Sequence, residues 1–207
     1  MSFRSLLPEI ALAQSLLRGM DIETETTALD ALAVPAWKRV IDRAARAAMA
    51  DGRSFEEARR DSGTTMHSAA LVLAISVAVW IGSDEFGNPG NLIVACVAGV
   101  LAWGLGTVVC CWVSRLVVAG ADRVGTDEVA RVLAFAMAPQ LLAVFNGLPI
   151  IGPLNRLLLF FWQIGVLVVA VRTTFHVNVG RALVVLALTL LALVGGVWLL
   201  VAMLNAV

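Results

Sequence analysis

The last 79 residues of this 207-residue chain contain no aspartate and no glutamate, and the whole chain has no tyrosine and only three cysteines. A carboxylate pair for acid–base catalysis cannot come from that region. The three cysteines are Cys96, Cys110 and Cys111, which have neither the spacing of a zinc site nor that of a C-x-x-C redox pair. These absences exclude several chemistries before any motif is considered.

Hydrophobic residues are abundant instead, at 60% of the chain, while charged residues make up 14% and the mean hydropathy is +0.90. A helix needs about 20 apolar residues to cross the roughly 30 Å hydrocarbon core of a bilayer. Five stretches come close to or exceed that length, and they are residues 66–82, 91–118, 129–148, 154–171 and 182–204. The pattern predicts an all-α polytopic membrane protein with five transmembrane helices at 66–207, after a small helical cytoplasmic region at 1–65.

The basic residues predict how these helices are oriented. Of the 15 lysines and arginines, only Arg156 would lie on the side opposite the N-terminus. Cytoplasmic loops retain Lys and Arg, so we expect the N-terminus in the cytoplasm and, after five spans, the C-terminus outside.

Proline interrupts the third apolar stretch and follows it. Pro139 removes a backbone donor within the stretch, so the ordinary expectation is a kinked helix; the functional alternative is a carbonyl exposed to a polar cavity beside the neighbouring Gln140. Pro149 and Pro153, together with Gly147 and Gly152, predict a tight turn before the fourth span. That turn disfavours a four-span alternative in which the third and fourth stretches are merged or re-entrant.

The N-terminal region is predicted to form short helices. Apolar residues recur at helical spacing over residues 6–17, and a second helix is expected to begin near Pro35. The second helix has Trp37 on an apolar face and a basic face made of Lys38, Arg39, Arg43 and Arg46. Such a helix can lie on anionic lipid or pack against protein, and both interpretations stay open. A third, short helix is expected to start at Ser54, because Ser54 and Glu57 have the spacing of a capping box.

No ionisable residue falls near the middle of any span, which disfavours a proton or ion pump. The sequence also lacks the common nucleophile, zinc-protease and phosphate-loop motifs. We therefore expect no enzyme activity, no cofactor, no metal and no nucleic-acid partner. Trp103 and Trp162 lie near the centres of their spans, where we expect each indole N–H to find a carbonyl or Gln163.

Residues 129–202 resemble the Yip1 family of five-span membrane proteins in its bacterial form. The resemblance consists of an Arg before a span, Pro139 within it, the turn from Pro149 to Pro153, and Trp162 in the next span. His176 and the pair Arg181–Ala182 complete it. It implies a cytoplasmic N-terminal region, a compact five-helix domain and a bacterial plasma (inner) membrane location. The tyrosine-containing cytoplasmic signature of eukaryotic members is missing, so their link to vesicle traffic does not carry over.

The contrast between an acid-free membrane domain and a charged head predicts a non-catalytic membrane scaffold. Its partners would be membrane lipid and a protein that docks on residues 1–65. The alternative is a channel or carrier for a lipid or a small neutral solute, suggested by the interrupted third span and Gln140. Small residues at Ala98, Ala102 and Gly106 favour packing within the chain, and a homo-oligomer has no specific support.

Overall fold

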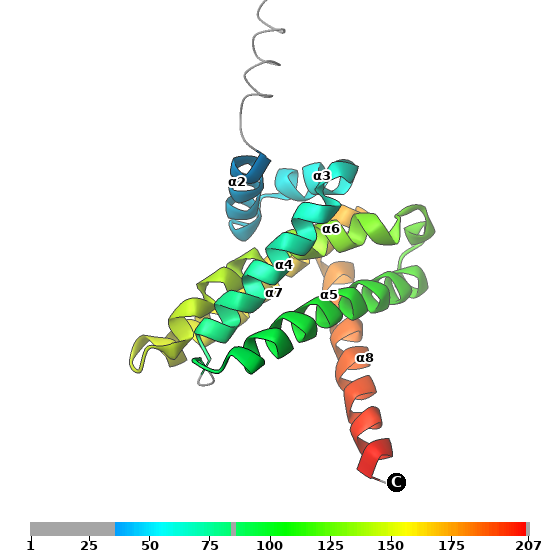
Figure 1. Ribbon diagram of the computed structural model, residues 1–207. Helices are drawn as coiled ribbons and strands as arrows, with labels where there is room; N and C mark the ends of the chain where they lie inside the picture. Colours follow the sequence, from blue (N-terminus) through cyan, green and yellow to red (C-terminus); the bar gives the residue numbers. More distant parts are fainter. Residues whose placement is uncertain (1–35, 84–85, 206–207) are drawn as a thin grey trace, which may run out of the picture. The chain divides into compact units, whose positions relative to one another are not determined.

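The computed structural model describes residues 36–83 and 86–205, and every regular element within them is a helix (Figure 1). The all-α prediction is therefore confirmed for this part of the chain. The predicted first helix at 6–17 lies outside the described residues.

The chain divides into two units, Met1–Ile41 and Asp42–Val207. Helix α2 (Ala36–Ala48) begins in the first unit and ends in the second. The boundary predicted after residue 65 falls inside the second unit, within α4 (Thr65–Ile81). The packing described below belongs to the second unit alone.

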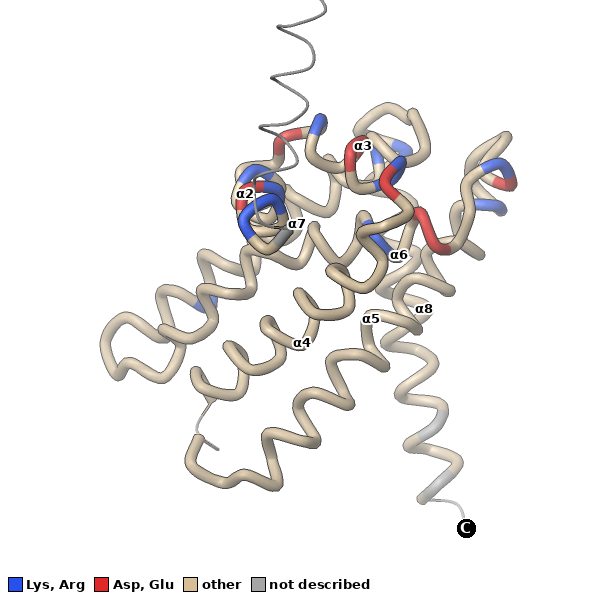
Figure 2. Tube along the Cα trace, turned by 45° about the horizontal axis from the view of Figure 1, so that its top comes forward, with Lys and Arg blue, Asp and Glu red and all other residues tan. Residues whose placement is uncertain are grey.

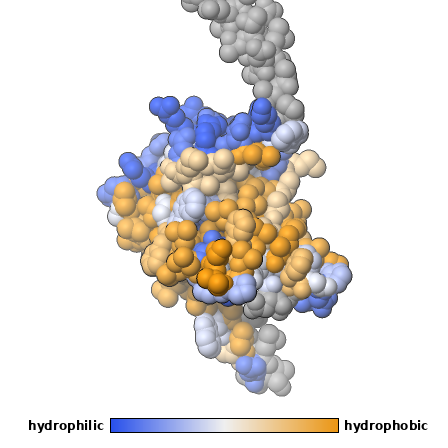
Figure 3. Space-filling model, turned by 90° about the vertical axis from the view of Figure 1, so that its left-hand side faces the viewer, coloured by the Kyte–Doolittle hydropathy of each residue, from blue (hydrophilic) through white to orange (hydrophobic). Residues whose placement is uncertain are grey.

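Five segments of the described residues are long and apolar enough to cross a membrane, in agreement with the predicted spans. Four of them are carried by α4, α5 (Pro89–Val117), α7 (Ile151–Phe175) and α8 (Val179–Asn205). Large apolar side chains cover their outer faces, beneath a hydrophilic cap (Figure 3). A soluble monomer rarely exposes so continuous an apolar surface, whereas hydrocarbon matches it.

The remaining span changes its helix type half-way. Helix α6 (Thr126–Ala136) ends before Pro139, and the chain continues as the 3-10 helix η4 (Ala138–Gly147). Proline cannot donate the backbone hydrogen bond that would extend α6. The predicted interruption at Pro139 is confirmed, but the outcome is a ten-residue 3-10 helix rather than a kinked α-helix. Runs of this kind longer than about four residues are uncommon.

Neighbouring helices hold η4 in this conformation. The side-chain amide of Asn155, in α7, donates to the carbonyl of Leu142 at 2.9 Å. Two glycines allow the backbones of the neighbouring helices to come close to that of η4. A Cβ on Gly82 would overlap the carbonyl oxygen of Ala143, and a Cβ on Gly152 would overlap the carbonyl oxygen of Asn146. Packing against α4 and α7 therefore stabilises a backbone geometry that isolated peptides rarely keep.

The short helix α3 (Gly52–Arg60) lies at one end of the bundle, against α6 and α7 (Figure 1). Its N-cap is Asp51, whose carboxylate accepts a hydrogen bond from the backbone N–H of Arg53 at 3.0 Å. The predicted cap at Ser54 is wrong by three residues, because the hydroxyl of Ser54 is buried and donates to the carbonyl of Asp51. The 3-10 turn η2 (Ser62–Thr64) then leads into α4.

A core of buried apolar side chains lies near the same end, where α5, α6, α7 and α8 meet. Its fully buried members include Val129, Val171 and Val185. Beyond this core the C-terminal half of α8 extends away from the other helices (Figure 1), and Trp198 and Leu199 are exposed there. The C-terminal half of α8 therefore has much of its surface exposed.

Candidate functional site

Charged side chains of the second unit gather at the end of the bundle that carries α3 (Figure 2). They come from α3 itself, from η3 (Ala121–Arg123) between α5 and α6, and from the ends of the long helices on this side, which carry Arg115, Asp127, Glu128, Arg172 and Arg181. We call this end the charged platform. Arg156 lies near the start of α7, at the end of that helix opposite to Arg172.

Arg131 fastens the platform to the apolar helices. It is 3% exposed, and its guanidinium donates to the carbonyls of Ala58 at 3.1 Å and Arg59 at 2.8 Å. These are carbonyls at the end of α3, which have no partner within that helix. The same guanidinium contacts the carboxylate of Asp127, one turn earlier on α6, at 2.8 Å. One cation from α6 therefore caps α3 and fixes its position.

A second set of ion pairs joins α3 to α6. Arg59 donates two hydrogen bonds to Glu56, at 2.8 and 3.2 Å, and reaches Glu128 at 3.3 Å. Arg60 also donates to Glu56, at 3.0 Å. The hydrogen bonds from Arg59, and next those from Arg60, lower the pKa of the Glu56 carboxyl below its ordinary value. The Glu56 carboxyl therefore loses its charge at a lower pH than a free glutamate does.

Two of the arginines predicted to form a lipid or partner surface are engaged within the chain. Arg46 makes a two-pronged contact with Glu57, at 2.8 and 3.1 Å. Arg43 reaches Asp61 at 3.3 Å, and its guanidinium carbon lies 5.6 Å from the ring centre of Phe135. The Arg43 side chain is only 14% exposed, so little of it is available to a lipid or a protein partner. Trp37, Lys38 and Arg39 lie in the part of α2 that belongs to the first unit.

The interruption at Pro139 frees a carbonyl, and a glutamine from another span satisfies it. The backbone N–H of Gln140 donates to Met137 at 2.9 Å, and Pro139 has no N–H to offer. The carbonyl of Ala136 instead accepts a hydrogen bond from the side-chain amide of Gln163, in α7, at 2.9 Å. The side-chain amide of Gln140 in turn donates to Oε1 of Gln163 at 3.4 Å. The residue that bonds this carbonyl directly is therefore Gln163, and Gln140 contacts it only through Gln163.

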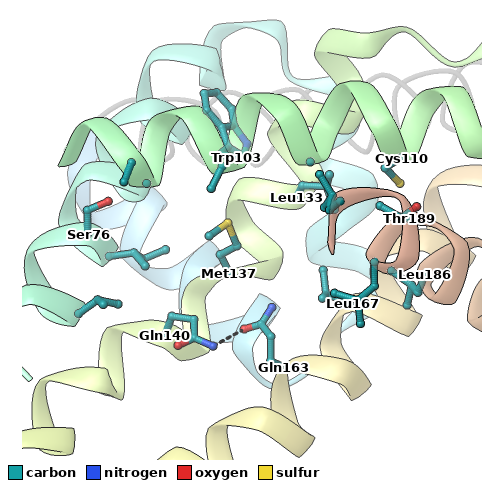
Figure 4. A pocket seen from close by; sticks show the side chains of 18 of the residues that line it. Ser76, Trp103, Cys110, Leu133, Met137, Gln140, Gln163, Leu167, Leu186 and Thr189 are labelled. Carbon is teal, nitrogen blue, oxygen red and sulfur yellow. Dashed lines mark hydrogen bonds between the residues drawn. The ribbon is translucent and has the colours of Figure 1, made fainter. Parts of the chain in front are cut away.

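These two glutamines line a cavity of about 620 Å³ between α4, α5, α6, α7 and α8 (Figure 4). The other labelled side chains around it are mostly apolar, among them Leu133, Met137 and Leu167. The hydroxyls of Ser76 and Thr189, which also line the cavity, donate to carbonyls of their own helices. The glutamine pair is therefore the main polar feature of the cavity wall.

Both central tryptophans donate to backbone carbonyls, as predicted. Trp103 donates to Ala130 at 2.9 Å, which joins α5 to α6. Trp162 donates to Ala48 at 2.7 Å, which joins α7 to the end of α2. The indoles therefore tie helices together.

The other predicted residues are not brought together. His176 is the C-cap of α7 in the left-handed conformation, with φ of 50°, and the nearby Arg181 lies in the first turn of α8. Pro149 and Pro153 lie at the opposite end of α7: Pro149 is in the turn before the helix, and Pro153 is in the first turn of the helix itself. With a rise of about 1.5 Å per residue, the 25 residues of α7 separate the two groups by over 30 Å.

Among the described residues no three His, Cys, Asp or Glu side chains are placed to hold a metal ion. The residues that sequence reasoning missed are Arg131 and its partners, and Asn155. The spacing of Asp127 and Arg131, four residues apart on one helix, was the available signal for the first. Nothing local distinguishes Asn155, because its acceptor lies on a separate helix.

The sequence model of the Yip1 domain matches residues 49–201. This range begins just before α3 and reaches nearly to the end of α8, so it includes both the platform and the cavity. No curated protein and no solved structure matches the chain.

Proposed function

This chain belongs to the Yip1 family, and on that premise we propose that it is a non-catalytic membrane scaffold whose charged platform docks a protein partner. The observation that carries this proposal is the buried Arg131, which holds α3 on the end of the bundle. A docking surface binds more tightly when it is preorganised, because less conformational entropy is lost on association.

The charges exposed on the platform suit such a role. Arg53, Arg123, Arg172 and Arg181 have no ion-pair partner among the described residues, and all four are exposed. Unpaired surface cations attract an acidic partner and speed its association. We propose that the platform faces the cytoplasm of a bacterium, with the chain in the plasma membrane, since cytoplasmic loops retain basic residues.

The proposal is tested by site-specific photocrosslinking in cells. A photoreactive amino acid replaces Arg53 or Arg123 on the platform, and Leu101 or Leu190 on the apolar surface serves as control, since both leucines are exposed. We expect a discrete protein adduct from the platform positions only. The adduct from position 53 should be lost when Arg123→Glu reverses the other charge, and the adduct from position 123 should be lost with Arg53→Glu. Adducts of equal yield from all four positions, or none from the platform, would refute the proposal.

The alternative function, a carrier or channel for a lipid or small neutral solute, has one observation in its favour, the cavity with its glutamine pair. The described residues provide no charged group within this cavity, which would suit an uncharged ligand. A ligand in the cavity does not require transport, and it is compatible with a scaffold.

A further inference from the structure

The cavity between α4, α5, α6, α7 and α8 has the size and lining of a ligand site. Its volume of about 620 Å³ lies within the range of roughly 300–1,000 Å³ that is typical of small-molecule pockets. None of the lining residues is Asp, Glu, Lys, Arg or His. Burying a charge here without a partner would be costly, so the ligand must be uncharged.

The glutamine pair determines which polar group the ligand should carry. Gln163 must point its NH₂ group at the carbonyl of Ala136, and this fixes its Oε1 toward Gln140. Gln140 must then present its own NH₂ group to that oxygen, so both amide orientations follow from the hydrogen bonds. Each NH₂ group has a second hydrogen, with no acceptor among the described residues. A ligand oxygen that accepts a hydrogen bond, such as a carbonyl, complements these donors.

The rim of the cavity shows from where a ligand would enter. Val79 and Leu190 line it and are 43% and 62% exposed, whereas Ile75 and Cys110 line its inner part and are 3% and 2% exposed. All four lie within segments that can cross a membrane. The accessible rim therefore faces hydrocarbon, and the ligand comes from the bilayer rather than from water.

We propose that this cavity binds a neutral lipid, with one hydrocarbon chain among the apolar side chains and a carbonyl oxygen at the amides of Gln140 and Gln163. The apolar wall receives the chain, and the glutamines fix its polar group. The site does not depend on a partner at the charged platform, so either proposal can fail without the other.

Helix α5 offers a matched pair of variants to test the site. Gly106 lines the cavity and Gly104 does not, yet an added Cβ meets nothing within 4 Å at either glycine. Gly106→Phe therefore fills the cavity with little strain, and Gly104→Phe makes the same chemical change outside the lining. Gln140→Leu removes an amide donor and leaves the bond from Gln163 to Ala136 in place.

The probe is a monoacylglycerol whose acyl chain carries a photoreactive diazirine and an alkyne tag, added to the full-length protein in phosphatidylcholine nanodiscs. Labelled peptides are identified by mass spectrometry. We expect labels on the cavity-lining stretches of α5 and α8, about tenfold weaker labelling of them in Gly106→Phe, and no change in Gly104→Phe. Equal labelling of these stretches in both glycine variants would overturn the proposal.

A second comparison tests the carbonyl. The ether analogue of the probe has the same chain and glycerol group but lacks the carbonyl oxygen. Wild type should be labelled about fivefold more strongly by the ester than by the ether, as one hydrogen bond predicts. The ratio should be smaller in Gln140→Leu, which keeps only the amide donor of Gln163. Equal labelling of wild type by both probes would overturn the assigned carbonyl, and competition by free glycerol would indicate a water-soluble occupant instead of a lipid.

Discussion

Replacing Arg131 with methionine should release α3 from the bundle. The guanidinium is buried and donates to two carbonyls at the end of α3, at 3.1 and 2.8 Å. Methionine has a similar length but no donor, so both carbonyls would lose their partner. The change is confined to one side chain and leaves the apolar packing of α6 nearly unchanged.

The magnitude follows from the hydrogen bonds. A bond from a charged donor contributes about 1.5–3 kcal/mol to stability, and the two together give roughly 3–6 kcal/mol. Relief from burying the cation offsets part of this sum. The contact with Asp127 adds little, because that carboxylate is 65% exposed. We therefore expect α3 to open more easily by about 3 kcal/mol, which is roughly a 100-fold change in its opening equilibrium.

Amide hydrogen exchange on the protein in detergent micelles measures this opening locally. Peptides that cover α3 should exchange roughly 100-fold faster in Arg131→Met, while peptides from α5 and α8 keep their wild-type rates. Arg115→Met is the control: its ion pair with Asp122 is 3.5 Å long and exposed, so less than about 0.5 kcal/mol should be lost. Wild-type exchange of α3 in Arg131→Met would refute the capping role of this residue.

Three further predictions follow. Gly82→Ala should lower the thermal midpoint of unfolding in detergent, because the new methyl group overlaps a carbonyl of η4, whereas Gly104→Ala, with open space around it, should leave the midpoint unchanged or raise it slightly. Cysteines placed at Phe86 and His176 should react with an impermeant maleimide from opposite sides of the membrane, the first from outside; labelling of both from one side would contradict the five-span topology. The pKa of Glu56 is lower in the folded chain than in the unfolded one, so its stabilising contribution is present above the ordinary glutamate pKa and is lost as the pH falls through the folded value. In wild type, the protection of α3 from hydrogen exchange should therefore fall as the pH is lowered, and in Glu56→Gln this fall should be smaller. An equal fall in both proteins would exclude the stabilising role of the Glu56 carboxylate.

Much of the architecture could be predicted from composition and local pattern. Long apolar stretches separated by turn residues indicate spans, because a helix satisfies its own backbone hydrogen bonds and needs only hydrocarbon around it. Pro139 predicted a break for the same local reason, since its ring removes a donor from whichever helix contains it. Both inferences depend on residues that are adjacent in sequence.

Less of the candidate site could be predicted from the sequence. Gln140 was singled out because it follows Pro139 in the sequence. The residue that bonds the freed carbonyl is Gln163, which is 23 positions away from Gln140. Arg131 looked like one more basic residue near a span. Its role depends on α3, whose last carbonyls meet it across more than 70 positions. Contacts of this range leave no periodic signal in a single sequence.

The amino-acid sequence by itself determined that this chain is helical, that it enters a membrane and where its third span breaks, since each of these follows from the solvation of short segments. Only the tertiary structure decided that η4 persists as a 3-10 helix, that a cation from α6 caps α3, and that five helices leave a cavity with two amides in its wall. Those features depend on the distances between helices, which small residues and side-chain volumes set only when all the spans are packed together.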